Sequence, residues 1–226
     1  MNPDPPAALD PRGRAAMERV LELLAAERAS VSSVVDERAW QVHVADSLTG
    51  LQVEELRGAE RIADIGAGAG FPGLALAAAL PGSQVDLVES VGRKCDFMNA
   101  AIQAAGLANA RVLNLRSEDL AKGEGRGAYD VVSARAVGRL STLAELASPL
   151  LKPNGLLVAW KGKRDREEEA ELERAAAELA MTPSGILDVG GEAGSKHRHL
   201  HLIRKTAETP PGLPRKAGLA KKRPKG

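Results

Sequence analysis

The chain of 226 residues is 44% hydrophobic and 27% charged, which is a globular composition, and it is long enough to bury a core without a disulfide or structural metal. Its five aromatic residues are too few for a platform of stacked bases, its single cysteine excludes a multi-cysteine zinc site, and no apolar run reaches the ~18 residues of a membrane span. The 31 Lys and Arg nearly balance the 30 Asp and Glu, and together these features predict a cytoplasmic protein that meets no membrane.

Two helices are predicted at the start of the chain. Residues 12–29 carry apolar side chains at helical spacing, and a second helix is expected from Asp36, as N-cap, to about Leu51. The inner face of the second helix would present Trp40, Val44, Leu48 and Leu51. We assign residues 1–55 to an N-terminal helical extension packed on the core.

From residue 56 onward, short apolar runs alternate with helical stretches. Strands are predicted at 61–65, 84–88, 111–115, 129–133 and 155–160, and helices at 72–80, 93–105, 140–151 and 166–181. This alternation predicts an α/β domain, residues 56–205, with a parallel, doubly wound sheet. Two last strands, at 186–189 and 199–203, are too close for a crossover helix, so a hairpin should place one antiparallel strand at the sheet end.

The last 21 residues are strongly basic. Residues 206–226 hold six Lys and Arg and one acid, a net charge of +5, which leaves the rest of the chain at −4. Four prolines oppose a regular helix there, so we predict a flexible basic tail. Such a tail either contacts an acidic partner or serves only as a solubilising terminus.

The strongest motif is the glycine loop Asp64-Ile65-Gly66-Ala67-Gly68-Ala69-Gly70-Phe71-Pro72-Gly73, between the first strand and its helix. Glycines at such a turn let a ligand approach the backbone, so Gly66, Gly68 and Gly70 are candidate cofactor contacts. The loop fits both GxGxxG and GxGxG. Because Ile65 ends the strand and Pro72 suits a first helical turn, the second register is favoured.

Two carboxylates accompany this loop. Asp64 is a candidate partner for the amino group or ribose of a sulfonium cofactor, and Glu89, at the end of the second strand, for ribose hydroxyls. Glu89 would serve a dinucleotide equally well. An NAD-dependent oxidoreductase therefore stays open as an alternative.

Several motifs in the same order resemble the RsmG family, also called glucose-inhibited division protein B. They are the glycine loop, His43-Val44-Ala45-Asp46-Ser47-Leu48, Ser133-Ala134-Arg135-Ala136, Trp160-Lys161-Gly162 and Pro214-Arg215-Lys216-Ala217-Gly218. The resemblance covers roughly residue 30 to the C-terminus. It implies a class I methyltransferase sheet, S-adenosylmethionine as cofactor, and methylation of guanine N7 in 16S rRNA of the small ribosomal subunit.

The resemblance also implies roles for single residues. Gly66 and Phe71 would contact the cofactor, Glu89 its ribose, and Ser117 with Glu118 its adenine. Arg135 would lie where cofactor and substrate meet, as a cofactor-binding and catalytic residue.

His43, Asp46 and Ser47 are spaced so that they share one helix face. The resemblance implies that this face borders the substrate cleft, with His43 and Asp46 as catalytic residues. Read from the residues alone, this face is simply a solvated polar surface. Val42 stands where the family has arginine, and Ser30-Val31-Ser32 replaces an Asn-x-Thr element. A diverged paralogue with another RNA target, or a catalytically silent RNA-binding factor, therefore stays open.

The expected chemistry needs no general base, because guanine N7 has a free lone pair and no proton. Ser-Ala-Arg-Ala after the fourth strand lacks the Asn/Asp-Pro-Pro-aromatic element, which disfavours methylation of an exocyclic amine. Cys95 lies within a predicted helix, away from the strand ends, which disfavours covalent catalysis by its thiolate. The alternating His197, His199 and His201 are expected to be polar edge residues, and we predict no metal. The protein is expected to be a monomer. We expect it to bind RNA phosphates through Arg139, Lys161, Lys163, Arg198, Arg215 and Lys216.

Overall fold

The computed structural model describes residues 9–27, 31–190 and 197–226. Seven strands form one sheet in the order β3-β2-β1-β4-β5-β7-β6. Only β7 runs antiparallel to its neighbours, β5 and β6, which confirms the predicted mostly parallel sheet with one antiparallel strand. The strands are β1 (Arg61–Ile65), β2 (Gln84–Glu89), β3 (Ala110–Asn114), β4 (Tyr129–Arg135), β5 (Leu151–Lys161), β6 (Met181–Asp188) and β7 (His199–Lys205).

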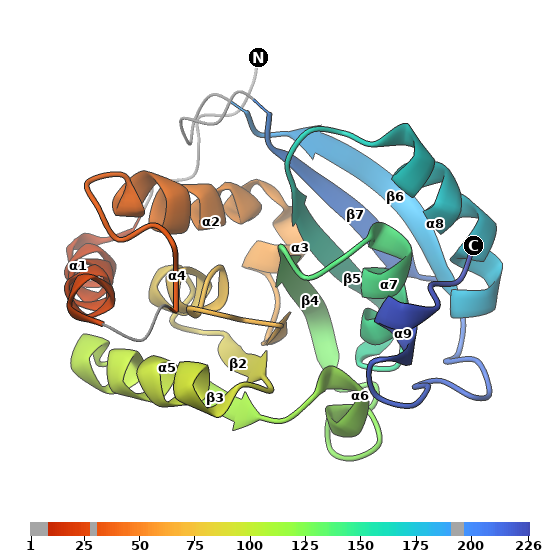
Figure 1. Cartoon of the computed structure of the whole chain (residues 1–226), viewed down its shortest axis with the longest axis horizontal. Coiled ribbons are helices and arrows are strands. Elements are labelled where there is room, and N and C mark those ends of the chain that lie inside the picture. Colours follow the sequence, from red (N-terminus) through yellow and green to blue (C-terminus); the bar gives the residue numbers. More distant parts are fainter. Residues whose placement is uncertain (1–8, 28–30, 191–196) are drawn as a thin grey trace.

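Helices cover both faces of this sheet (Figure 1). On one side lie α1 (Pro11–Ala26), α4 (Gly73–Ala79) and α5 (Gly92–Ala105), and on the other α7 (Leu140–Ala147) and α8 (Arg166–Leu179). Short helices are α3 (Glu54–Arg57), α6 (Ser117–Leu120) and α9 (Leu219–Lys222). In the described ranges, every helix is too short or too polar to cross a membrane.

The N-terminal helical segment shares its hydrophobic core with the sheet. Met17, Val20 and Leu24 of α1 are fully buried in the same cluster as Ile62 of β1 and Leu74 of α4. The sequence predicts a helix to residue 29, but α1 ends at Ala26 and residues 28–30 lie outside the described part.

The predicted second helix forms with a changing pitch. A π-helical turn (Trp40–Ala45) continues into α2 (Asp46–Leu48) and a 3₁₀ turn (Thr49–Gln52). The helix starts at Trp40 rather than at Asp36, although the Asp36 carboxylate accepts a hydrogen bond from the backbone N–H of Arg38, as an N-cap does, and another from the Arg38 side chain. This irregular segment brings His43, Asp46 and Ser47 to one buried surface, so the alternative of a solvated polar face is wrong.

Two element boundaries near the sheet end differ from the prediction. Helix α7 ends at Ala147, before Pro149, which has no N–H to donate, and Leu151 already belongs to β5. Helix α8 ends at Leu179 because Ala180 adopts a left-handed conformation, and β6 begins at Met181. The first half of β6 is exposed, so apolar alternation gave no signal for it.

The C-terminal tail is not the flexible arm that its charge and prolines predict. Leu213 is buried in the cluster formed by α7 and its neighbours, and Arg215 binds the buried carboxylate of Glu145. A buried carboxylate needs a cationic partner, which the tail supplies. Residues 213–222 therefore lie against the domain.

Candidate functional site

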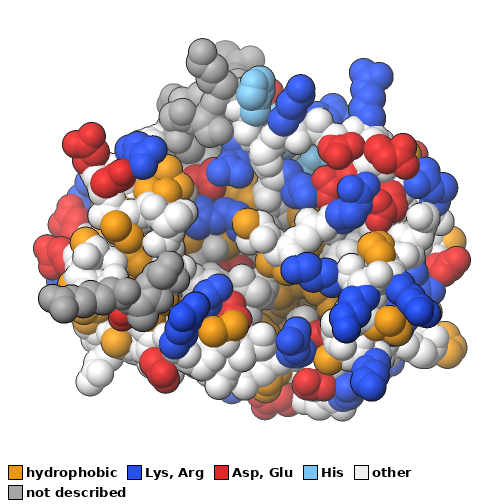
Figure 2. Space-filling model, in the orientation of Figure 1, with side chains coloured by type: hydrophobic (Ala, Val, Ile, Leu, Met, Phe, Trp, Pro, Cys, Tyr) orange, Lys and Arg blue, Asp and Glu red, His pale blue; other side chains and the backbone are white. Residues whose placement is uncertain are grey.

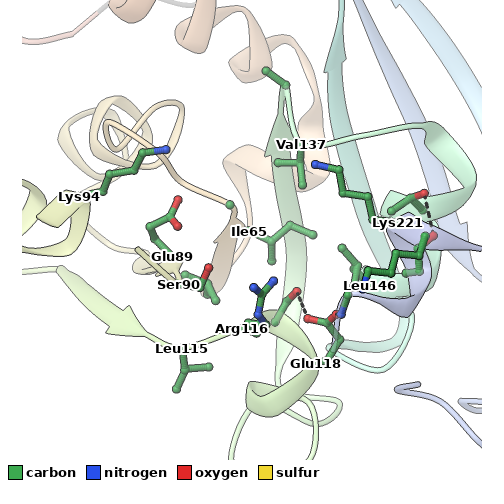
Figure 3. A pocket seen from close by; sticks show the side chains of 18 residues that line it. Ile65, Glu89, Ser90, Lys94, Leu115, Arg116, Glu118, Val137, Leu146 and Lys221 are labelled. Atoms are coloured by element: carbon green, nitrogen blue, oxygen red, sulfur yellow. Dashed lines mark hydrogen bonds between the residues drawn. The ribbon is translucent and has the colours of Figure 1, made fainter. Parts of the chain in front are cut away.

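A cavity of about 530 Å³ lies at the carboxyl ends of the central strands. Figure 3 shows Glu89 and Lys94 on one side of it and Lys221 and Leu146 on the other. In an open α/β sheet, the crevice beyond the carboxyl ends of the strands is where ligands bind. The lining residues that the argument uses are Gly66, Glu89, Ser117, Glu118, Ala136 and Gly218.

The glycine loop borders this cavity in a conformation that requires glycine. Gly66, Gly68 and Gly70 have φ values of +65°, +61° and +90°, which matches the GxGxG register. A Cβ atom on Gly66 would approach Cγ2 of Val137 to 2.7 Å and point into the space that the cavity needs. The loop therefore forms a cradle that fits a ligand pressed against the backbone.

Asp64, in β1, holds this loop through hydrogen bonds and does not line the cavity. Its buried carboxylate accepts hydrogen bonds from the Gly73 N–H at 2.9 Å and the Ser133 hydroxyl at 3.0 Å. Burial raises the pKa of Asp64 to about 7, against the effect of these bonds. Both of its oxygens serve to position the turn, and the predicted contact of Asp64 with the cofactor stays a prediction.

Glu89 does lie at the cavity, as predicted. One carboxylate oxygen accepts from the Gly68 N–H at 3.1 Å and the other from the Val91 N–H at 2.9 Å. These bonds fix the carboxylate at the tip of β2. Glu118, at the start of α6, lies on another side of the cavity (Figure 3), and its neighbour Ser117 also lines the cavity.

A second cavity, of about 340 Å³, adjoins the first. Ala136, directly after β4, lines both cavities, and its φ of +59° turns the chain there. The polar residues around the second cavity come from five separate segments of the chain. They include Ser32, His43, Arg135, Lys161 and Arg198.

A buried carboxylate organises the cations of this second cavity. Asp46 is 1% exposed, and its Oδ2 accepts a hydrogen bond from Nη1 of Arg135 at 2.8 Å. Its Oδ1 lies 2.5 Å from Nε of Arg198, an ion pair without hydrogen-bond geometry. Arg135 also donates to the carbonyl oxygen of Val42 at 3.0 Å, so this departure from the family sequence lies at the cavity wall.

His43 is held beside this cluster as a neutral ring. Its ring stacks on Phe71, with centroids 5.0 Å apart, and its Nε2 lies 2.9 Å from the Val34 carbonyl oxygen. Burial lowers the pKa of His43. Phe71 therefore supports a residue of the second cavity and is absent from the lining of the first, and its predicted contact with the cofactor stays a prediction.

Arg135 likewise belongs to the second cavity and is absent from the lining of the first. Its neighbour Ala136 lines both cavities, and the predicted roles of Arg135 in cofactor binding and catalysis stay predictions.

The predicted RNA-contacting residues divide into two groups. Arg139 pairs with Glu171 at 2.5 Å, Lys161 with Glu168 at 2.5 Å, and Arg215 with Glu145, so these three cations are already neutralised. Lys163 and Lys216 are exposed, and Arg198 lines the second cavity. The guanidinium of Arg215 anchors the tail to Glu145, and its predicted phosphate contact stays a prediction. Figure 2 shows further Lys and Arg side chains gathered on the face that carries α6, α7 and α9.

Several site residues escaped the sequence reasoning. Lys94, Arg116, Gly218 and Lys221 line the first cavity, and only the strand-end positions of the first two could have suggested this. Across the described residues, no group of three or more His, Cys, Asp or Glu has the arrangement of a metal site. His201, predicted as an edge residue, is buried.

Comparison with known proteins places this geometry in a family. Residues 19–200 match the family model described as rRNA small subunit methyltransferase G. A Ribosomal RNA small subunit methyltransferase G from Rubrobacter xylanophilus is 45% identical over 186 residues, covering 80% of this chain and 71% of its own. The relative of the same name from Desulfitobacterium hafniense is 38% identical over 202 residues, covering 88% of this chain and 82% of its own.

Solved structures agree on the fold. An O-methyltransferase from Bacillus cereus in complex with SAH has a TM-score of 0.59 and 20% identity, covering 84% of this chain and 91% of that chain. A SAM-dependent methyltransferase from Aquifex aeolicus has a TM-score of 0.57 and 17% identity, covering 80% and 99%. The predicted methyltransferase fold is confirmed, and with the family match over most of its length the chain belongs to the rRNA small subunit methyltransferase G family.

Proposed function

We propose that this enzyme transfers a methyl group from S-adenosylmethionine to N7 of a guanine in 16S rRNA of the small ribosomal subunit. The observation that carries this proposal is the pair of cavities that meet at Ala136, one bordered by the glycine loop and the other by half-buried cations. Family membership and the names of the two relatives support rRNA as the substrate.

The first cavity has the residues that a nucleoside cofactor needs. Gly66 gives access to the backbone, Glu89 offers carboxylate oxygens to ribose hydroxyls, and Ser117 with Glu118 would hold the base. When bound, S-adenosylmethionine supplies an electrophilic methyl group on a sulfonium sulfur. The three left-handed glycines of the GxGxG register favour this cofactor over a dinucleotide.

The second cavity supplies orientation rather than proton transfer. Guanine N7 attacks with a lone pair and releases no proton, so the enzyme needs only to hold the purine in line with the methyl group. Arg135 is fixed by Asp46 and Val42 O, and His43 is fixed by Phe71 and Val34 O. Asp46, which forms ion pairs with both Arg135 and Arg198, is a positioning residue.

Substrate binding would use cations that reach solvent or the second cavity. Lys163 and Lys216 are exposed, and Arg198, although paired with Asp46, lines the second cavity, where phosphates of a folded RNA would be held. A single chain carries both cavities, so we propose that the enzyme acts as a monomer in the cytoplasm.

Thermal-shift titration tests the cofactor part of this proposal. S-adenosylhomocysteine should raise the melting temperature of the purified enzyme in a saturable way, while NAD should leave it unchanged. Stabilisation by NAD with none by S-adenosylhomocysteine would contradict the proposal and support an oxidoreductase.

A further inference from the structure

We propose that residues 213–222, which we call the C-terminal strap, complete the cofactor cavity and contribute to cofactor affinity. The inference rests on the proposed function, since it assigns S-adenosylmethionine to the first cavity. It gives the basic tail a role in cofactor binding that neither its charge nor its prolines suggests.

The strap forms one wall of the cavity. Gly218, Ala220, Lys221 and Lys222 line it together with residues at the ends of β1, β2 and β3. In Figure 3, Lys221 lies across the cavity from Glu89 and Lys94, so the strap faces the glycine-loop side. Without the strap, this side of the cavity would open to water.

An anchor distant from the cavity holds the strap in place. Arg215 donates from Nε to Glu145 Oε1 at 2.6 Å and also binds Oε2, and Glu145 is only 2% exposed. Paired bonds to one carboxylate fix both position and direction. Leu213 adds a buried apolar contact, and its carbonyl oxygen accepts from Arg126 at 3.2 Å.

The domain residues that hold the strap are also residues that line the cavity. Glu118 accepts a hydrogen bond from the Gly218 N–H at 2.7 Å, and the Thr142 hydroxyl donates to the Ala220 carbonyl oxygen at 3.3 Å. Both Glu118 and Thr142 border the cavity. A ligand that orders these side chains therefore stabilises the docked strap, and a docked strap strengthens ligand binding by the same factor.

Calorimetric titration with S-adenosylhomocysteine tests the strap through two variants. Arg215→Gln removes the anchor, and Gly218→Pro removes the N–H that Glu118 binds and forbids the φ of +79° at this position. Both should weaken binding at least tenfold. Gly218→Pro lies outside the Glu145 pair, so it keeps the test valid if loss of that pair unfolds the domain.

Lys225→Gln is the matched control, because it removes another tail cation, paired with Glu178, that does not line the cavity. Its affinity should stay within twofold of the wild type. If the Arg215 and Gly218 variants bind as tightly as this control, the strap does not contribute to cofactor affinity. The basic tail would then have RNA as its only proposed ligand.

Trypsin digestion of the wild-type enzyme gives an independent measurement. Saturating S-adenosylhomocysteine should slow cleavage after Lys221 and Lys222 at least fivefold, as followed by mass spectrometry of the released peptides. Equal cleavage rates with and without the ligand would contradict the coupling. A wild type that does not bind S-adenosylhomocysteine would contradict the proposed cofactor. A wild type that binds it no more tightly than the Arg215 and Gly218 variants would contradict only the role of the strap.

Discussion

Gly66 is the residue at which the cofactor cradle is most sensitive to a side chain. We expect Gly66→Asp to abolish binding of S-adenosylhomocysteine, because its Cβ would meet Val137 and its carboxylate would fill the cavity. Isothermal titration measures the affinity, and circular dichroism should show an unchanged fold.

Gly106→Asp is the control for this change. Gly106 has nearly the same φ, +66°, but it ends α5 in open space, so the variant carries equal backbone strain away from the cavity. It should bind like the wild type. Retained binding by Gly66→Asp would show that the loop holds the cofactor in another register.

Arg135 is the residue that we expect to separate catalysis from cofactor binding. Arg135→Lys keeps the charge but loses the planar guanidinium that spans Asp46 and Val42 O, so methyl transfer to ribosomal subunits should fall about 10- to 100-fold in kcat/KM. The Kd for S-adenosylhomocysteine should stay within about twofold, because Arg135 does not line the first cavity.

Arg111→Lys serves as the comparison, since Arg111 forms a similar pair with the buried Asp86 away from both cavities. It should leave methyl transfer close to the wild-type rate. An Arg135 variant that transfers methyl groups as fast as the Arg111 variant would remove Arg135 from the substrate site.

At the scale of elements, the glycine loop depends on the carboxylate that pins it to β4. The pKa of Asp64 is raised from 3.8 to about 7, so the folded state holds this proton more tightly than the unfolded chain. The stabilisation is complete below pH 4 and decreases as pH rises to about 7, by an amount on the order of a few kcal/mol. Above pH 8 it should not change further.

Urea unfolding of the wild type and of Asp64→Asn at several pH values measures this effect. The free energy of unfolding of the wild type should fall relative to the variant between pH 4.5 and 7.5, because Asn cannot titrate. Parallel stability curves for the two proteins across this range would refute the raised pKa.

The sequence predicts those elements whose signal is local. The sheet follows from alternating apolar runs, and the cradle follows from glycines between a strand end and a helix start. Strand β6 lacks such a signal because its exposed residues carry no apolar alternation. For Asp64, the pattern shows that a carboxylate is near the loop but not that it accepts hydrogen bonds from Gly73 and Ser133.

Contacts between distant parts of the chain account for what the sequence did not reveal. Arg215 binds Glu145 across 70 positions, and Arg135 binds Asp46 across 89 positions. A charged residue gives no indication in the sequence of which buried partner it will meet. The sequence therefore predicts a flexible tail, although Arg215 is bound to Glu145 of α7 in the structure.

For the whole molecule, the near-zero net charge conceals an uneven distribution. Most cations at the site are paired with carboxylates, while Lys163 and Lys216 are exposed to a partner. We expect the double variant Lys163→Gln/Lys216→Gln to weaken RNA binding and to reduce the slope of log K against log salt by about 1.5. Filter binding of 16S rRNA between 50 and 300 mM salt measures that slope.

Lys152→Gln provides the control for this measurement. Lys152 lies at the start of β5, away from the carboxyl ends of the strands, where it pairs with Asp130, and its loss should leave the salt slope unchanged. Equal slopes for the double variant and this control would place RNA on another surface.

The central claim is that two adjoining cavities carry out methyl transfer to guanine N7. The most direct measurement incubates the enzyme and labelled S-adenosylmethionine with small ribosomal subunits from a strain that lacks the modification, and then maps the labelled base. We predict that the wild type labels one guanine of 16S rRNA at N7, while Gly66→Asp transfers no label. Tight cofactor binding without transfer, or label on another atom, would contradict the account.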